Sequence, residues 1–263
     1  MYGAYATVLR SHGLDSFNAL LNVEGDTDLS KRGLDAWRER SILTLGPHVL
    51  YLKRYRNPPL RSQLVWRIRG FASTAEAEWY WIGQLRGLGL SAPRPVACGW
   101  RCRRGLEQAS LLLVARVEGE SLEQVVRREA DGPLGDRAFL LQVARRLARD
   151  VATLHGAGLF HRDLYLAHVF LRTSAEGEPG LTFIDLQRVI RAVLGRKRRW
   201  VVKDLASLNY STPLAAASTA DRVRWYKWYR GSGKLTARDK KLIRAIAAKS
   251  KRIARHSRKH GLG

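Results

Sequence analysis

The stretch of sequence that decides the fold is His161-Arg162-Asp163-Leu164-Tyr165-Leu166-Ala167-His168-Val169-Phe170-Leu171. It follows residues 136–155, where apolar side chains recur at helical spacing. Two predicted strands come next, residues 168–172 and 181–184, and the second ends directly before Asp185. His-Arg-Asp alone recurs by chance in arginine-rich chains. The conjunction of a long amphipathic helix, this loop, a hairpin and a final aspartate therefore carries the prediction.

The same stretch resembles the catalytic loop of protein-kinase-like phosphotransferases, whose pattern is H-R-D-x-x-x-x-N. Here His168 stands where Asn is usual. Asp185 resembles the Asp of that family's D-F-G element. The resemblance implies an α+β, bilobal protein-kinase-like fold. It implies a small antiparallel-sheet N-lobe at residues 1–115, a hinge at 116–120 and a larger, mainly helical C-lobe at 121–263.

Two upstream residues fall where the same family has a lysine–glutamate pair. Val49-Leu50-Tyr51-Leu52-Lys53 resembles the V-A-I-K strand, which ends in the lysine. Glu78 precedes Ile82 and Leu85 by four and seven residues, so its carboxylate shares the inward stripe of a predicted helix. A half-buried carboxylate needs a cation. We expect Lys53 to be that cation.

The resemblance implies a role for each of these residues in phosphoryl transfer from ATP. Lys53 would neutralise the α- and β-phosphates while Glu78 holds its flexible stem in place. Asp185 would ligate Mg²⁺, a hard cation that prefers carboxylate oxygens. Asp163 would orient the acceptor hydroxyl and accept its proton.

The rest of the loop and the nucleotide pocket follow from the same resemblance. His161 and Arg162 are counted with the catalytic residues. His168 would bind a second metal directly or form hydrogen bonds around it.

The adenine edge would meet the carbonyl of Ala115 and the amide of Val117, unless these residues form a simple linker between lobes. Tyr51 stands where kinases usually have a small residue above adenine, which tightens or reshapes the pocket.

More narrowly, the chain is similar to the bacterial lipopolysaccharide inner-core sugar kinases, the heptose kinase and Kdo kinase family. Their catalytic loop, H-R-D-x-Y-x-x-H, is matched by residues 161–168, and their I-D-L-x-R by residues 184–188. Further similar segments lie at 203–208, 222–225 and 251–256. The resemblance implies ATP-dependent phosphorylation of a heptose or Kdo hydroxyl at the cytoplasmic face of the inner membrane. His168 is then a mark of the family.

The chain departs from the protein-kinase pattern in three places. No clean glycine-rich loop appears, and the segment between Gly25 and Gly33 is either the flap over the phosphates or a surface loop. Gln187 replaces the glycine of D-F-G, and no A-P-E follows, which favours a glycan or small acceptor over a protein. Basic residues follow Asp185 instead. They form either a rim that orients the acceptor or a generic basic loop. They are Arg188, Arg191, Arg196, Lys197, Arg198, Arg199 and Lys203.

The net charge of +24 requires an anionic partner. The C-terminal residues 234–263 are strongly basic and show a helical pattern with Thr236 as its cap. They form either a docked helix with a solvated basic face or an anion-binding surface. No apolar run approaches the roughly 18 residues of a membrane span. We expect a cytoplasmic protein, peripheral to the inner membrane, that binds an anionic glycolipid.

Elsewhere the first third is predicted to be mainly strands, with a hairpin of residues 41–45 and 49–55 around Gly46-Pro47. A helix at 75–88, a Pro93-Arg94-Pro95 loop and a strand at 111–115 follow.

Two other functions stay open from the residues alone. One is a related kinase that acts on a protein or small-molecule hydroxyl. The other is a non-catalytic module that binds nucleotide or nucleic acid through its basic tail. The joint presence of Lys53, Glu78, Asp163 and Asp185 disfavours the second, so nucleic acid is not the expected partner.

Overall fold

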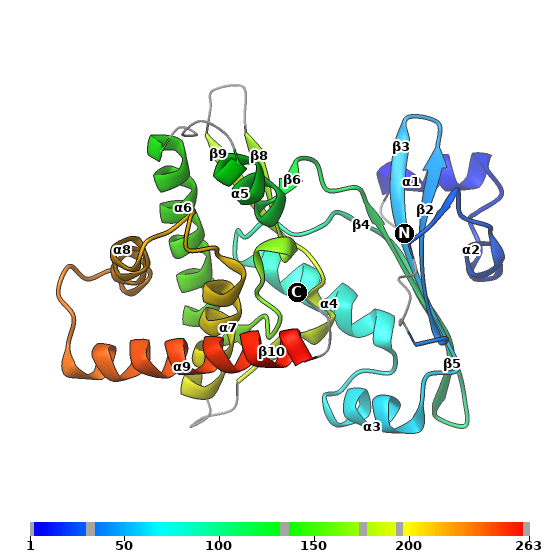
Figure 1. Ribbon diagram of the computed structural model, residues 1–263. Helices are drawn as coiled ribbons and strands as arrows, with labels where there is room; N and C mark the ends of the chain where they lie inside the picture. Colours follow the sequence, from blue (N-terminus) through cyan, green and yellow to red (C-terminus); the bar gives the residue numbers. More distant parts are fainter. Residues whose placement is uncertain (1–2, 30–34, 132–136, 174–177, 193–196, 260–263) are drawn as a thin grey trace. The chain divides into compact units, whose positions relative to one another are not determined.

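Figure 1 shows the computed structural model, which describes residues 3–29, 35–131, 137–173, 178–192 and 197–259. The chain divides into two compact units. The first comprises Met1–Gly87 and Ala92–Val117, and the second comprises Leu88–Ser91 and Glu118–Gly263. A five-stranded antiparallel sheet lies in the first unit, and the second is mainly helical.

The sheet of the first unit has the strand order β1-β2-β3-β5-β4. Its strands are β1 (Thr27–Asp28), β2 (Arg38–Leu45), β3 (His48–Arg56), β4 (Pro95–Arg103) and β5 (Leu106–Ala115). Gly46 and Pro47 form the turn between β2 and β3, and Gly46 adopts a φ of 58°, which glycine tolerates without strain. The predicted hairpin is therefore confirmed, although both strands are longer than expected.

Two expectations for the first unit are wrong. Helices α1 (Gly3–Ser11) and α2 (Phe17–Asn22) precede the sheet, where strands were expected to dominate. In addition, β4 continues to Arg103 beyond the predicted proline loop, and β5 begins at Leu106 rather than Leu111. Polar residues and Gly99 interrupt the apolar alternation over this hairpin, so its strands are defined by pairing and not by a hydrophobic pattern.

Apolar residues of β3 and β5 form the core on one face of the sheet. Leu50 and Leu52 of β3 are almost fully buried, and α1 and α2 contribute Leu9, Leu20 and Leu21 to the same cluster. Leu50 and Leu52 alternate with the half-buried Lys53 as strand geometry requires. The lysine therefore lies on the strand face opposite this core.

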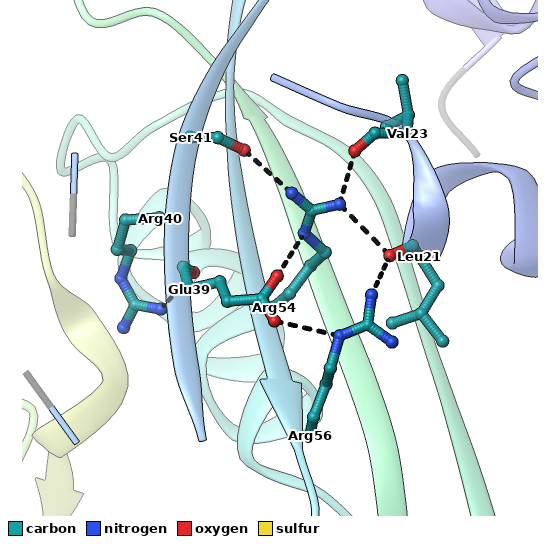
Figure 2. Close-up of polar contacts among 7 residues, drawn as sticks. All are labelled: Leu21, Val23, Glu39, Arg40, Ser41, Arg54 and Arg56. Carbon is teal, nitrogen blue, oxygen red and sulfur yellow. Dashed lines mark hydrogen bonds and ion pairs between the residues drawn. The ribbon is translucent and has the colours of Figure 1, made fainter. Parts of the chain in front are cut away.

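Figure 2 shows how a buried arginine attaches α2 to the sheet. Arg54 of β3 donates hydrogen bonds from Nη1 to the carbonyl oxygens of Leu21 (3.1 Å) and Val23 (2.6 Å) at the end of α2. Its Nε lies 3.1 Å from Oε2 of Glu39, and the other carboxylate oxygen of Glu39 accepts a hydrogen bond from Arg56. The last carbonyls of a helix have no partner within the helix. Arg54 supplies that partner, and burial lowers the pKa of its guanidinium.

Helices α3 (Leu60–Ile68) and α4 (Thr74–Gly87) complete the first unit, and α4 confirms the helix predicted at 75–88. The N-terminus of α4 is held by β5. The buried carboxylate of Glu107 accepts hydrogen bonds from the backbone N–H (3.0 Å) and the hydroxyl (3.1 Å) of Thr74. Ser110 donates to the same carboxylate. Burial is the largest influence on Glu107 and raises its pKa.

The second unit is built on long helices and two small sheets. Its elements are β6 (Glu120–Ser121), α5 (Leu122–Asp131), α6 (Arg137–Gly156), β7 (Leu159–Phe160), η1 (Leu166–His168), β8 (Val169–Thr173), β9 (Pro179–Phe183), η2 (Leu186–Arg188), β10 (Ile190–Arg191), α7 (Lys197–Ser211), α8 (Thr219–Arg230) and α9 (Ala237–Lys259). The helix predicted at 136–155 is confirmed as α6, apart from residue 136, which lies outside the described residues. The predicted strand at 168–172 starts one residue later because His168 ends a 3₁₀ turn.

Helix α9 packs across α7, as Figure 1 shows. Thr236 caps its start as predicted, because the Thr236 hydroxyl accepts the backbone N–H of Asp239 at 3.1 Å. The Asp239 carboxylate in turn accepts the hydroxyl (2.6 Å) and the backbone N–H (3.0 Å) of Thr236, and these two hydrogen bonds lower the pKa of Asp239 to about 2. Asn209 of α7 donates to Ser250 of α9 at 2.9 Å.

Within the described part of the chain, every helix is too short or too polar to cross a bilayer.

Candidate active site

The first unit contributes a buried ion pair. Lys53 Nζ on β3 donates to Glu78 Oε1 on α4 at 2.6 Å. The side chains are only 15% and 3% exposed, respectively, so solvent screens the pair weakly. Removing one partner of such a pair costs about 3–5 kcal/mol. The expected pairing of these two residues is present, and an ammonium that is fixed in this way suits an anionic ligand.

The residues predicted to meet the adenine edge also lie in the first unit. Ala115 ends β5 opposite Leu50, and its backbone N–H donates to the carbonyl of Arg94 at 2.9 Å. Val117 follows, and its amide makes no hydrogen bond to another described residue. Tyr51 is half-buried on β3, opposite Val114. An unpaired amide of this kind is compatible with the predicted contact to an adenine edge.

The segment considered for a phosphate flap is part of the sheet as far as residue 29. Thr27 and Asp28 form β1, paired with β2, and the carboxylate of Asp26 accepts the backbone N–H of Thr44 at 2.6 Å. A side chain at Gly25 would lie 2.4 Å from Ser41, so the chain there is pressed against β2. Residues 30–33 of the predicted segment lie outside the described residues.

The second unit holds the His-Arg-Asp loop, and the buried Asp204 of α7 fixes its backbone. One oxygen of Asp204 accepts the backbone N–H of His161 at 2.8 Å, and the other accepts that of Arg162 at 2.7 Å. The Asp204 side chain is fully buried. Arg162 has a φ of 70°, a left-handed conformation that is uncommon for arginine, and its guanidinium lies 5.0 Å from the ring centre of Trp200. The loop is therefore held in an unusual conformation by a residue distant in sequence.

The side chain of His161 is structural in this arrangement. It is fully buried, and Nε2 lies 3.0 Å from the carbonyl oxygen of Ile184. A carbonyl only accepts, so Nε2 carries the proton and Nδ1 does not. Burial lowers the pKa of His161 and keeps the ring neutral. His161 thus connects the loop to the residue before Asp185.

His168 and Asp185, the predicted metal ligands, lie at the end of the same hairpin. The backbone N–H of Ile184 donates to the carbonyl of His168 at 3.0 Å. Asp185 adopts a left-handed conformation (φ 56°, ψ 54°), which aspartate tolerates and which is frequent at functional sites. His168 Nδ1 lies 2.7 Å from the carbonyl oxygen of Asp163 and must donate to it. The lone pair of its ring therefore lies on Nε2, as in histidines that ligate metals.

Asp185 and His168 fit a magnesium site that is completed by water and phosphates better than a site made entirely of protein ligands. Among the described residues, no group of three His, Cys, Asp or Glu side chains could hold a metal ion. Magnesium usually takes one or two carboxylates and fills its remaining positions with water and substrate phosphates. Asp185 is a carboxylate at a position that suits such a partial site.

Two basic residues flank Asp163. The sequence indicated them only as members of a basic segment. Arg188 Nη1 lies 3.0 Å from one carboxylate oxygen of Asp163, and Lys203 Nζ lies 3.8 Å from the other. Other members of the segment have different contacts, such as Arg199 over the Trp200 ring at 4.9 Å. Arg196 lies outside the described residues. Asp204, Arg188 and Lys203 are the site residues whose roles the sequence did not reveal.

The chain matches known proteins over most of its length. The family model described as "Lipopolysaccharide kinase (Kdo/WaaP) family" matches residues 31–229. The lipopolysaccharide core heptose(I) kinase WaaP of Escherichia coli K12 is 30% identical over 195 residues, which is 72% of each chain. The 3-deoxy-D-manno-octulosonic acid kinase of Vibrio vulnificus CMCP6 is 26% identical over 125 residues, 46% of this chain and 49% of the relative.

A solved structure has the same fold. It is described as "WaaP in complex with acyl carrier protein" and has a TM-score of 0.72, 22% sequence identity and coverage of 93% of this chain and 95% of that chain. The predicted α+β, protein-kinase-like fold class is confirmed by this likeness together with the antiparallel sheet and the helices of the two units.

Proposed function

The chain belongs to the lipopolysaccharide kinase (Kdo/WaaP) family, and from this premise we propose that it transfers the γ-phosphoryl group of ATP to a sugar hydroxyl of the lipopolysaccharide inner core. The acceptor sugar is a heptose or Kdo, the two that occur in the names of its relatives. The observation that carries the proposal is the 2.6 Å ion pair between Lys53 and Glu78. A lysine held by a glutamate of a neighbouring helix matches the lysine–glutamate pair that must be in place for phosphoryl transfer in protein kinases.

In this proposal the residues keep the roles that the family resemblance implies. Lys53 neutralises the α- and β-phosphates, Glu78 holds the lysine stem, and the amide of Val117 and the carbonyl of Ala115 bind the adenine edge. Asp185 would hold the magnesium ion that accompanies ATP, and His168 would bind a second metal directly or form hydrogen bonds around it. The metal supplies neutralisation of phosphate charge.

Asp163 performs the proton chemistry. Its carboxylate accepts a hydrogen bond from the acceptor hydroxyl, orients the oxygen toward the γ-phosphorus and takes the proton as the new bond forms. His161 and Arg162 contribute through the loop backbone, which Asp204 holds through their N–H groups. Positioning of this kind supplies much of the catalysis in phosphoryl transfer.

We further propose that α9 attaches the protein to the anionic cytoplasmic face of the inner membrane, where a glycolipid acceptor is accessible. Its only acidic residue, Asp239, is buried, and none of its exposed basic side chains pairs with an acidic residue among the described residues. Those exposed side chains are Arg238, Lys240, Lys241, Arg244, Lys251, Arg252, Arg255, Arg258 and Lys259. Basic residues near an anionic bilayer contribute about 1 kcal/mol each to binding.

The direct test is transfer of labelled γ-phosphate from Mg-ATP to purified deep-rough lipopolysaccharide, with casein and no acceptor as comparisons. We expect label on the sugar that Asp163→Ala abolishes and that Asp15→Ala, a change at an exposed aspartate, preserves. Label only on casein would instead indicate a protein kinase. Salt-sensitive nucleic-acid binding without any transfer would indicate a non-catalytic module.

A further inference from the structure

Asp163 faces two cations that come from different elements of the second unit. Arg188 of η2 lies 3.0 Å from Oδ2 and also donates a hydrogen bond to Oδ1 at 3.1 Å. Lys203 of α7 lies 3.8 Å from Oδ1, which is beyond hydrogen-bond distance. The Asp163 side chain is 14% exposed and that of Lys203 is 25% exposed, so both face a partly dry environment.

The cluster carries more positive charge than Asp163 requires. One carboxylate is neutralised by Arg188 alone, and this leaves the charge of Lys203 in excess. Burial opposes that charge and is the largest influence lowering the pKa of Lys203 to about 8. The charges of Asp163 and Asp204 raise the pKa of Lys203, whereas those of Arg188 and Arg162 lower it further. An ammonium kept in this setting is suited to a further anion.

The ammonium is also free to form new hydrogen bonds. Lys203 has three donors, and its contact with Asp163 is too long to engage one of them. Its flexible stem allows the ammonium to move toward a neighbouring anion. Arg188 is 52% exposed and uses a single nitrogen for Asp163, so it also retains donors.

We propose that Lys203, assisted by Arg188, binds the phosphoryl group during its transfer. The inference rests on the proposed function. In the step, the acceptor oxygen forms a bond to the γ-phosphorus, the bond to the β–γ bridging oxygen breaks, ADP leaves with that electron pair, and Asp163 takes the acceptor proton. With the hydroxyl about 3 Å from Asp163 and about 3 Å from the phosphorus, the phosphorus lies within about 6 Å of the carboxylate, and its oxygens come within reach of the flexible Lys203 side chain.

The test compares Lys203→Met and Lys203→Arg with the control Lys227→Met, a half-buried lysine of α8 in the same unit. We expect Lys203→Met to lower kcat by about 100- to 1000-fold, as for loss of a group that stabilises transition-state charge, with an unchanged KM for the sugar acceptor. The same loss is expected in ATP hydrolysis without sugar, where water is the acceptor. Lys203→Gln repeats the measurement if the methionine variant is poorly folded.

A pH profile separates this role from a structural one. Lys203 must be protonated to bind the phosphoryl group, so kcat/KM of the wild type should fall as pH rises through about 8. Lys203→Arg should retain activity within about tenfold and lose this alkaline decline, because arginine stays charged.

Three results would overturn the inference: unchanged kinetics in Lys203→Met, an alkaline decline that persists in Lys203→Arg, or a raised acceptor KM with normal kcat and ATP hydrolysis. The last would assign the cations to an anionic group of the acceptor. If the wild type hydrolyses ATP but labels no sugar, the proposed acceptor is wrong. The effect of Lys203→Met on ATP hydrolysis then still decides whether Lys203 binds the phosphoryl group. Absence of both activities overturns both.

Discussion

The carboxylate of Asp204 accepts the backbone N–H of Arg162 at 2.7 Å, although the two residues come from a helix and a loop far apart in the sequence. The same carboxylate binds the N–H of His161 and lies 3.2 Å from Nε2 of His155. A fully buried acceptor with three donors around it has no substitute in solvent. Asp204 is therefore a positioning residue for the loop that carries Asp163.

Asp204→Ala should lower both stability and turnover. Leaving buried donors without an acceptor costs about 1–3 kcal/mol for each group, so we expect the free energy of unfolding to fall by roughly 3 kcal/mol or more. The looser loop should lower kcat by about 100-fold with little change in KM for ATP. Urea unfolding and steady-state kinetics measure the two effects. Asp15→Ala serves as the control, and a stable, fully active Asp204→Ala protein would refute the assignment.

Changing Lys53 and Glu78 singly and together should separate folding from catalysis. Lys53→Met leaves a buried carboxylate without its cation and should cost about 3–5 kcal/mol. Adding Glu78→Gln removes the unpaired charge and should restore much of that stability, whereas phosphoryl transfer stays lost. Thermal unfolding of the four proteins of the cycle gives the coupling energy. Independent, additive effects on stability would contradict the buried pair.

The buried Glu107 should make stability depend on pH in a predictable direction. Its pKa is raised in the folded state, so folding favours the protonated form. This contribution is fully present below the unfolded pKa of about 4.3 and is lost as pH rises through the folded pKa. The difference in unfolding free energy, wild type minus Glu107→Gln, should therefore decrease between pH 4 and pH 7. A difference that is constant or increases over this range would disagree with burial as the dominant cause.

Neutralising three cations of α9 should weaken binding to anionic vesicles. The triple change Lys251→Gln, Arg252→Gln and Arg255→Gln removes about 3 kcal/mol, or roughly 100-fold in affinity, for vesicles that contain phosphatidylglycerol. Cosedimentation with the vesicles at low and moderate salt measures this loss of affinity. The matched control carries Arg10→Gln, Arg61→Gln and Arg145→Gln, exposed arginines outside α9. Equal losses in both triples would indicate that net charge alone, and not α9, binds the membrane.

Elements with a strong local pattern were predictable. The hairpin around Gly46-Pro47, helix α4, helix α6 and the capped start of α9 all follow from turn residues, periodicity or capping residues. The short helices α1 and α2 and the β4–β5 hairpin were not predicted correctly. Short helices have little periodicity, and the β4–β5 strands are specified by pairing with their neighbours.

By itself, the sequence determined the position of the His161–His168 loop, of Asp185 and of the Lys53–Glu78 pair, because these residues lie in local motifs with characteristic spacing. Only the tertiary structure decided that Asp204 holds the loop and that Arg188 and Lys203 flank Asp163. Lys203 is 40 residues from Asp163, and a contact made by chain folding over that distance leaves no periodic trace in the sequence. The physical reason is that burial and hydrogen-bond geometry, not residue spacing, bring such groups together.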